Sequence, residues 1–425
     1  MASTSTYWGS FEFVPLPVDV QAPKNLLRLA RVWFRRSGET IPLAIRFRSS
    51  LQSNVARKMF EFVLKSYAHR LWSLTFVVTN RELGTFFGAN GVRFPRLQHI
   101  DLAVASNTDG SIATPPTPVQ GSIDLSGFHR APFLQHVALR ILDGIHPTDL
   151  RLPWGQLAQV DLGNTPTGPN EFMKMMKELS FLKIGVFSIH FARSYADEQS
   201  TTDFRTITIP HVQRLRLRLI HPSQDARIFS KLQMPCLEGL WLEREEVEHP
   251  IRDMTLYETL LATLNAPLKH AIMAEYSFPT TTCFSPRLHH SPRVVYQKLE
   301  GVFRSANDLT SLFLCPGVFI HPLVLEKLAS GDFLPSLEKL SVSSVSGWDI
   351  VWMAQDRNIA SMRPESGPSS NSASALMARP VALNFLDLSV MGCGLDVGSL
   401  QKLQDAVGAL LLRCGYLFRY IPITE

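Results

Sequence analysis

The chain has 425 residues, of which 45% are hydrophobic and 19% charged, and its formal net charge is +5. With 26 Phe and 7 Trp it can build a sizeable core, so composition excludes a wholly disordered chain, a collagen, a coiled coil and a disulfide scaffold. At roughly 100–200 residues per domain, this length corresponds to two to four domains unless one elongated architecture uses all of it.

Charge and cysteine usage narrow the possible compartments and partners. The Lys and Arg residues are scattered with no run longer than two, whereas nucleic-acid-binding proteins concentrate positive charge in a patch or stripe. The 5 cysteines are odd in number, and no pair has the short spacing of a zinc or redox motif. The amino-terminal residues lack an apolar signal core, and Pro316 and Pro322 interrupt the longest uncharged apolar stretch. We therefore expect a cytoplasmic or nuclear protein without cofactor, metal or membrane association.

Near the start of the chain, residues 24–47 read KNLLRLARVWFRRSGETIPLAIRF. This segment resembles one that is common in fungal F-box proteins, where a helix ending in W-x-x-R-S-G precedes a strand of the type P-L-x-I. The matching residues here are Trp33, Arg36, Ser37, Gly38, Pro42, Leu43 and Ile45. Two later segments are similar to phrases of the same family: AHRLWSLTF at 68–76 to its H-x-x-R-W-x-x-L strand, with the Trp displaced, and LPWGQLAQVDL at 152–162 to its L-P-W-x-Q-L-T-x-L-x-L phrase.

The resemblance implies a role in substrate recognition. The family brings a target to a cullin–RING ubiquitin ligase through a Skp-type adaptor, which docks on an F-box ahead of this region. Residues 7–13, YWGSFEF, look like the strand that closes the F-box region. We therefore expect the chain to begin just after the position of the F-box, so that an adaptor would bind only if an F-box exists upstream of Met1.

Several stretches have the apolar period of a helix. In VARKMFEFVLKSYAH at 55–69, residues Val55, Met59, Val63 and Tyr67 fall on one face. Further helices are predicted at 171–179, 255–264, 294–306, 323–329 and 400–412.

Between these helices one phrase recurs, Pro-x-Leu-x-x-apolar-x-apolar. It reads FPRLQHIDL at 94–102, APFLQHVAL at 131–139, IPHVQRLRL at 209–217, MPCLEGLWL at 234–242 and LPSLEKLSV at 334–342, and looser copies bring the number to eleven. The apolar-x-apolar end has the period of a short strand with one buried face, and we expect the Pro at the first residue of that strand. The first apolar positions of the copies are Leu71, Leu97, Leu134, Leu157, Leu182, Val212, Leu237, Leu268, Leu309, Leu337 and Leu383.

Strand, turn, helix and turn at a mean spacing of about 31 residues predict an α/β fold of the leucine-rich-repeat-like solenoid type. A curved parallel sheet would lie inside and helices outside, with about eleven irregular repeats. A doubly wound sheet is the alternative, because it also alternates strands and helices. We expect a leading segment at 1–50, which resembles the post-F-box region, and a solenoid at 51–425, with loop insertions at 106–127, 277–292 and 361–380.

Catalytic motifs are not evident in the sequence. There is no P-loop and no Gly-x-Ser-x-Gly, and the glycine-rich residues 391–399 depart from dinucleotide-binding spacing, so they indicate a strand-to-helix turn. His289 and His290 lie in a Pro-rich segment that favours a surface loop. His99 and His136 hold equivalent positions in successive copies, which predicts either two solvated histidines or a pH-sensitive patch.

Equivalent positions of stacked parallel strands form columns, and one column carries the candidate binding residues. Its middle reads Val186, Arg216, Trp241, Ile272 and Phe313, an outward-facing row rich in residue types that anchor protein interfaces. The segment RLRLRLI adds a row of alternate arginines, Arg214, Arg216 and Arg218. Counting along the strands places Glu243 opposite Arg218, so the row either pairs inside the chain or meets an acidic partner.

The sequence predicts a monomeric, non-catalytic protein-binding solenoid with an unknown protein target. Its binding residues would be Val186, Arg214, Arg216, Arg218, Trp241, Ile272 and Phe313. Two alternatives remain: an α/β enzyme with dispersed catalytic residues, and a weak nucleic-acid binder acting through the arginine row.

Overall fold

The computed structural model describes most of the chain and divides it into two compact units, Met1–Ile189 and His190–Glu425. Each unit is a mixed α/β structure built on parallel strands. The described residues are 10–13, 23–50, 54–79, 92–105, 126–141, 147, 150–191, 206–220, 226–246, 255–264, 266–277, 296–297, 299–314, 319–344, 347–362, 379–392, 397–410 and 415–422.

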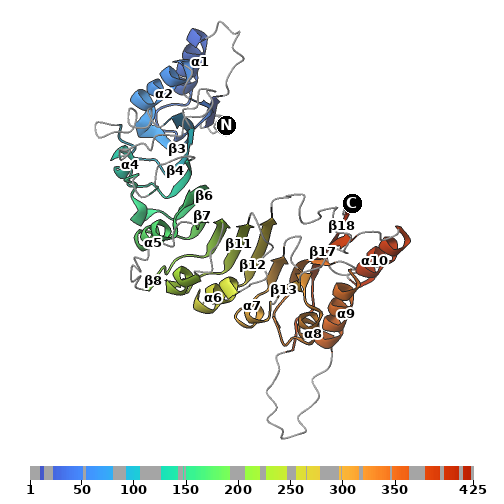
Figure 1. Ribbon diagram of the computed structural model, residues 1–425. Coiled ribbons are helices and arrows are strands. Elements are labelled where there is room, and N and C mark those ends of the chain that lie inside the picture. The colour runs from blue at the N-terminus through green and yellow to red at the C-terminus, as the bar shows by residue number, and fades with distance from the viewer. Residues whose placement is uncertain are drawn as a thin grey trace, which may run out of the picture. The chain divides into compact units, whose positions relative to one another are not determined.

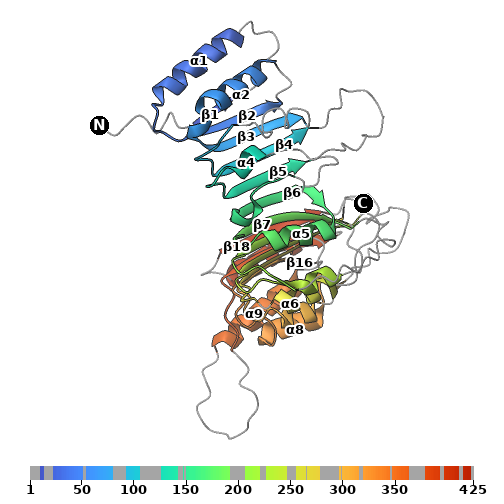
Figure 2. The same cartoon turned by 90° about the vertical axis from the view of Figure 1, so that its left-hand side faces the viewer.

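In the first unit, successive strands pair in chain order, and every pairing is parallel (Figure 2). The strands are β1 (Ser10–Phe13), β2 (Leu43–Ser50), β3 (Leu71–Thr79), β4 (His99–Ala105), β5 (His136–Ile141), β6 (Gln159–Thr167) and β7 (Ile184–His190). The connections carry α1 (Pro23–Arg36), α2 (Asn54–Tyr67), η2 (Ala68–Arg70), α4 (Ser126–His129), η4 (Trp154–Gln156) and α5 (Pro169–Glu178). The sequence prediction of parallel strands joined by helices is confirmed here.

The second unit repeats this plan, and α6, α7, α8 and α9 lie along one side of its strands (Figure 1). Its main strands pair in parallel in the order β9 (Arg214–Ile220), β11 (Gly239–Glu246), β12 (His270–Ser277), β14 (Ser311–Leu314), β16 (Lys339–Ser344), β17 (Phe385–Gly392) and β18 (Gly415–Pro422). Short strands are β8 (Ile207–Thr208), β10 (Leu232–Gln233), β13 (Tyr296–Gln297) and β15 (Phe319–Ile320). The helices are η5 (Ala226–Lys231), α6 (Thr255–Leu264), α7 (Glu300–Arg304), α8 (Pro322–Ser330), α9 (Trp348–Met362) and α10 (Val397–Leu410).

Each of the eleven copies of the repeated phrase runs into one of these strands, but its proline is not where the sequence suggested. The backbone N–H of Leu97 bonds to the carbonyl of Phe94, which makes Pro95 the second residue of a tight turn that ends before β4 starts at His99. Leu337 and Leu334 form the same turn around Pro335. The expectation that the proline begins the strand is therefore wrong. Its fixed φ suits the second position of a turn, and a proline there leaves every strand N–H available for pairing.

Most of the copies are joined by the same pair of hydrogen bonds at the start of the strand. In the first unit, the carbonyl of Gln98 accepts from the N–H groups of Gln135 and His136, and the carbonyl of Gln135 accepts from the next pair. In the second unit, the carbonyls of Gln213, Glu238 and other residues at this position do the same. This repeated bond keeps neighbouring strands in register, so equivalent residues of successive copies stand side by side.

The predicted helices mostly form where the apolar period places them. Those predicted at 55–69, 171–179, 255–264, 323–329 and 400–412 correspond to α2, α5, α6, α8 and α10, with ends shifted by a few residues. The helix predicted at 294–306 forms only in part among the described residues, because Tyr296 and Gln297 pair as β13 and Glu300–Arg304 is helical. The sequence reading missed α9, whose buried face includes the charged residue Arg357 among its apolar residues.

Most of the predicted insertions lie outside the described residues, at 106–125, 278–292 and 363–378. The described ends of these segments belong to regular elements or adjoin them: α4 begins at Ser126, β12 ends at Ser277 and α9 ends at Met362. Across the described parts of the chain, no helix combines the length and the apolar content needed to cross a membrane.

The motif at the end of α1 has a clear structural role. Gly38 adopts a left-handed φ of 70°, and the Ser37 hydroxyl donates to the carbonyl of Phe34 at 2.7 Å, which together close the helix. Arg70, only 2% exposed, donates to the Ser37 hydroxyl at 2.7 Å and to the carbonyl of Ile41 at 3.1 and 3.2 Å. Ser37 of the Arg-Ser-Gly phrase and the later Arg70 therefore form one buried polar contact.

Arg357 of α9 is the largest fully buried side chain of the described residues and is 0% exposed. Its guanidinium donates to five backbone carbonyls, those of Leu328, Leu334, Pro335, Leu337 and Val381, at 2.5–3.3 Å. Burial lowers the pKa of Arg357 to about 10. The side chain links α9 to the turn before β16 and to the segment before β17. Among the described residues, its positive charge is stabilised by the carbonyl dipoles of these segments and not by the carboxylate of an ion pair.

Replacing Arg357 with Met should destabilise the second unit by about 3 kcal/mol or more, because five carbonyls would lose their donor in a site closed to water. Chemical denaturation followed by circular dichroism measures this change. Lys402→Met on α10 is the matched control, since Lys402 is exposed, and its effect should stay within about 0.5 kcal/mol. Equal stability of the two variants would contradict the role assigned to Arg357.

Candidate functional site

The candidate column is formed in the second unit as the sequence predicted. Strand register places Arg216 beside Trp241, Trp241 beside Ile272, and Ile272 beside Phe313. The column continues to Ser341 and Asp387. All but Asp387 are partly exposed, whereas the alternate residues of the same strands, such as Leu240 and Leu242, are buried in the core. Because adjacent strands are about 4.8 Å apart, Trp241, Ile272 and Phe313 form one row of apolar side chains.

Arg216 and Trp241 form the best-defined contact of this row. The guanidinium carbon of Arg216 lies 3.9 Å from the centroid of the Trp241 ring, a stacked cation–π arrangement. The same guanidinium donates through Nε to Oε1 of Glu243 at 2.6 Å. The Trp241 ring is thus fixed on one side, and its buried Nε1 has no hydrogen-bond partner among the described residues.

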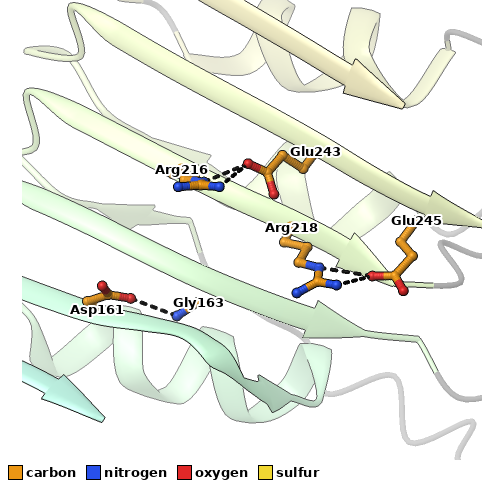
Figure 3. Close-up of polar contacts among 6 residues, drawn as sticks. All are labelled: Asp161, Gly163, Arg216, Arg218, Glu243 and Glu245. Atoms are coloured by element: carbon orange, nitrogen blue, oxygen red, sulfur yellow. Dashed lines mark hydrogen bonds and ion pairs between the residues drawn. The ribbon is translucent and has the colours of Figure 1, made fainter. Parts of the chain in front are cut away.

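The second arginine of the row is also paired inside the chain. Arg218 donates to Oε2 of Glu245 through Nε at 2.9 Å and through Nη2 at 2.6 Å (Figure 3). The carboxylate side chains of Glu243 and Glu245 are only 5% and 10% exposed, against 40% and 37% for Arg216 and Arg218. Two nearly buried carboxylates therefore hold two half-exposed guanidinium groups.

The expected pairing of Arg218 with Glu243 is wrong, although Glu243 does stand opposite Arg218 in the register. Each arginine reaches diagonally to the carboxylate two residues further along β11, because Trp241 occupies the position opposite Arg216 and the Arg216 guanidinium lies over its ring. Sequence reasoning missed Glu245. The alternation of Glu243 and Glu245, matching that of Arg216 and Arg218, was the available signal.

Arg214, the first arginine of the row, is exposed and makes no ion pair with the residues that the structure describes. Its Cγ lies 3.6 Å from where a Cβ on Gly239 would be, so its aliphatic stem lies over the neighbouring strand. Of the three arginines, only this one keeps its charge unpaired within the described parts of the chain.

Val186 lies in the first unit, whereas the other candidate residues lie in the second. It ends the column Thr75, Asp101, Ala138, Asp161, Val186, which the strand register confirms. A Cβ at Gly163 would lie 2.9 Å from Val186 Cγ1, so Val186 packs over a position where any side chain would collide with it. This packing against β6 explains the presence of Val186 on the sheet face, so no binding partner is needed to explain it.

Apart from Ala138, the remaining column residues of the first unit are polar. Arg140 binds both oxygens of Asp101 at 2.9 and 3.1 Å, and Asp161 accepts a hydrogen bond from the backbone N–H of Gly163 at 2.9 Å. Figure 3 shows the second of these contacts. This face of the sheet thus carries an Arg–Asp ion pair in the first unit, and in the second unit it carries the apolar row together with two Arg–Glu ion pairs.

His99 and His136 stand side by side on β4 and β5, two residues before Asp101 and Ala138. Their Nδ1 atoms are in direct contact, and their ring centroids are 4.1 Å apart. Trp72 packs edge-on against His99 with a centroid distance of 4.9 Å. Desolvation lowers the pKa of both rings, and for His136 the neighbouring His99 lowers it further. The two are partly buried and in contact, not separately solvated as one of the two expectations had it.

Two other motifs singled out in the sequence have simpler outcomes. The glycine-rich residues 391–399 connect β17, which ends at Gly392, to α10, which begins at Val397, as expected for a strand-to-helix turn. His289 and His290 lie outside the described residues. Within the described segments, no group of three or more His, Cys, Asp or Glu side chains is placed to hold a metal ion.

Comparisons with known proteins add no family assignment. No known protein-family model matches the chain, and no curated protein matches it.

A double-mutant cycle should show that the half-buried ion pair is coupled and the exposed one is not. Replacing Arg216 and Glu243 with Ala, singly and together, should give a coupling energy of about 1–3 kcal/mol in denaturation experiments. The matched pair Lys269 and Glu238, 3.1 Å apart and about half exposed, should give less than about 0.5 kcal/mol. Equal couplings would mean that the Glu243 site is as well solvated as the surface.

Proposed function

We propose that this chain is a leucine-rich-repeat-like solenoid that binds a protein partner and catalyses no reaction. In this proposal the strands line the binding face, the helices form the outer face, and the eleven copies of the phrase are the repeats. The regular strand register and the shared hydrogen bond between copies support a repeat architecture. A doubly wound sheet is less consistent with them, because its strand order reverses at a switch point, whereas here successive main strands pair in chain order within each unit.

The observation that carries the binding proposal is the row Trp241, Ile272 and Phe313 on neighbouring strands of one face. Tryptophan and arginine are enriched among residues that dominate protein interfaces, and they act best when their side chains are already held in place. Arg216 stacks on Trp241 and is bonded to Glu243, so little conformational entropy would be lost when a partner covers this pair. An apolar row bordered by such anchored groups fits a protein surface.

The ion pairs argue against the nucleic-acid alternative. Binding to a phosphate backbone depends on cations that are free to replace counterions. Arg216 and Arg218 are already bound to Glu243 and Glu245, which leaves Arg214 as the one cation of the arginine row without an ion pair in the described parts of the chain. The arginine row therefore contributes shape and stacking more than net positive charge.

The resemblance to fungal F-box proteins suggests the kind of partner. We infer that the chain acts in the cytoplasm or nucleus as a monomeric substrate-recognition component of a cullin–RING ubiquitin ligase, with a Skp-type adaptor bound through an F-box if one exists upstream. The Arg-Ser-Gly phrase is consistent with this reading, since Ser37 and Gly38 close α1 and Arg70 connects it to the next strand. That role in the fold gives a physical reason for such residues to occur together.

Partner capture followed by mass spectrometry tests the proposal. The variant Trp241→Ala/Phe313→Ala should lose proteins that the wild type retains, with affinity for an isolated partner reduced at least about tenfold, or 1.4 kcal/mol. Both residues are partly exposed on the sheet face, so the variant should still fold, which circular dichroism verifies.

The matched control is Trp352→Ala/Leu323→Ala, which removes an exposed Trp and an exposed Leu from α9 and α8 of the same unit. These side chains are 60% and 56% exposed, and this variant should keep the partners. The proposal fails if the sheet-face variant retains every partner, or if the helix-face variant alone loses them.

A further inference from the structure

The contact between His99 and His136 is not explained by the proposed binding face, which lies in the other unit. Two imidazole rings converge here through the same type of atom, Nδ1, from equivalent positions of adjacent strands. A nitrogen pair of this kind can share at most one proton, so at least one ring presents its lone pair to the other. One ring therefore donates its Nδ1–H to the lone pair of the other, and both nitrogens face the same point between β4 and β5.

The surroundings favour the form of histidine that binds metal ions. Metal-binding histidine is neutral, and within the described parts of the chain neither ring forms an ion pair with a carboxylate that would stabilise its protonated form. The edge-on contact with Trp72 supports the orientation of the His99 ring. The nearest carboxylate on β4, Asp101, is bound by Arg140 through both oxygens and is therefore not a competing partner for the rings.

We propose that His99 and His136 bind one divalent transition-metal ion through their two Nδ1 atoms. Imidazole nitrogen suits ions such as Cu²⁺, Ni²⁺ and Zn²⁺, whereas Mg²⁺ and Ca²⁺ prefer oxygen ligands. Nitrogen–zinc bonds of about 2.0–2.1 Å in tetrahedral geometry hold two ligand atoms about 3.3 Å apart, so the rings must rotate away from each other to admit the ion.

The site supplies two protein ligands and no more. No third His, Cys, Asp or Glu among the described residues is placed to complete it. The other coordination positions of the ion are filled by water or by a donor atom of a bound molecule, as in metal sites that keep an open position. Such a site binds more weakly than a four-ligand structural zinc site.

Copper titration at pH 7.5 tests the proposal, since Cu²⁺ binds most tightly among these ions and its electron paramagnetic resonance spectrum reports nitrogen ligands. The purified chain should bind one Cu²⁺ more tightly than any further ions, with a nitrogen-ligated spectrum, and Zn²⁺ should compete for it. Excess Mg²⁺ should not.

The variants make the result specific to this pair. His99→Ala and His136→Ala should each weaken the tightest site at least about tenfold, and the double variant should weaken it little further, because one substitution already destroys a chelate. The adjacent pair His289→Ala/His290→Ala is the control and should leave the tightest site unchanged. Circular dichroism confirms that each variant folds.

Two outcomes would overturn the proposal. If the single and double variants of His99 and His136 bind Cu²⁺ as the wild type does, the ions are bound adventitiously by other histidines. If each single variant has a small and additive effect, the two rings act as independent surface groups and not as one site.

Discussion

In-register pairing of parallel strands is the constraint on which the rest of this structure depends. At most steps one backbone carbonyl accepts hydrogen bonds from two successive N–H groups at the start of the next strand, as Gln98 does for Gln135 and His136. A slip of one residue would turn every buried leucine of a strand to the opposite face. The register therefore fixes which side chains become neighbours, and both the apolar row and the histidine pair are consequences of it.

The tight turns before the strands need their own support, and polar side chains that are buried or half-buried provide it. Gln156 donates to the carbonyls of Ala131 and Leu134, which belong to the turn of the preceding copy. Arg357 binds five carbonyls of the second unit in the same way but carries a charge. Backbone carbonyls at turns lack partners within a strand or helix, so a long side chain from the next element satisfies them.

Much of the charge on the strand face is paired inside the described parts of the chain, with Arg214 as an exception, and this pairing shapes any interaction there. Arg216 and Arg218 are held by nearly buried carboxylates, and Arg140 is held by Asp101. A guanidinium fixed by a carboxylate still offers its planar face, and in Arg216 that face lies on Trp241. Recognition by the apolar row would therefore depend on shape and burial more than on long-range attraction, and it would vary little with salt.

Much of this arrangement could be predicted from the sequence because it depends on local periodicity. The phrase ending in apolar-x-apolar identified the strands, and counting along it placed Trp241, Ile272 and Phe313 in one column, as the register confirms. The helices with a purely apolar face were also found. The helix α9 was missed because Arg357 interrupts its apolar face, and what makes a buried arginine acceptable is a set of carbonyls from other elements.

The sequence by itself determined the alternation of strands and helices and the order of residues in each column, because both follow from side-chain period. Tertiary structure decided the partners. Glu243 stands opposite Arg218 but binds Arg216. The reason is that Trp241 takes the position opposite Arg216, and the Arg216 guanidinium lies over the Trp241 ring. It also brought the Nδ1 atoms of His99 and His136 together. The order of residues in a column determines which side chains can come into contact. Side-chain rotation, burial and competing contacts in the folded chain decide which of these contacts form.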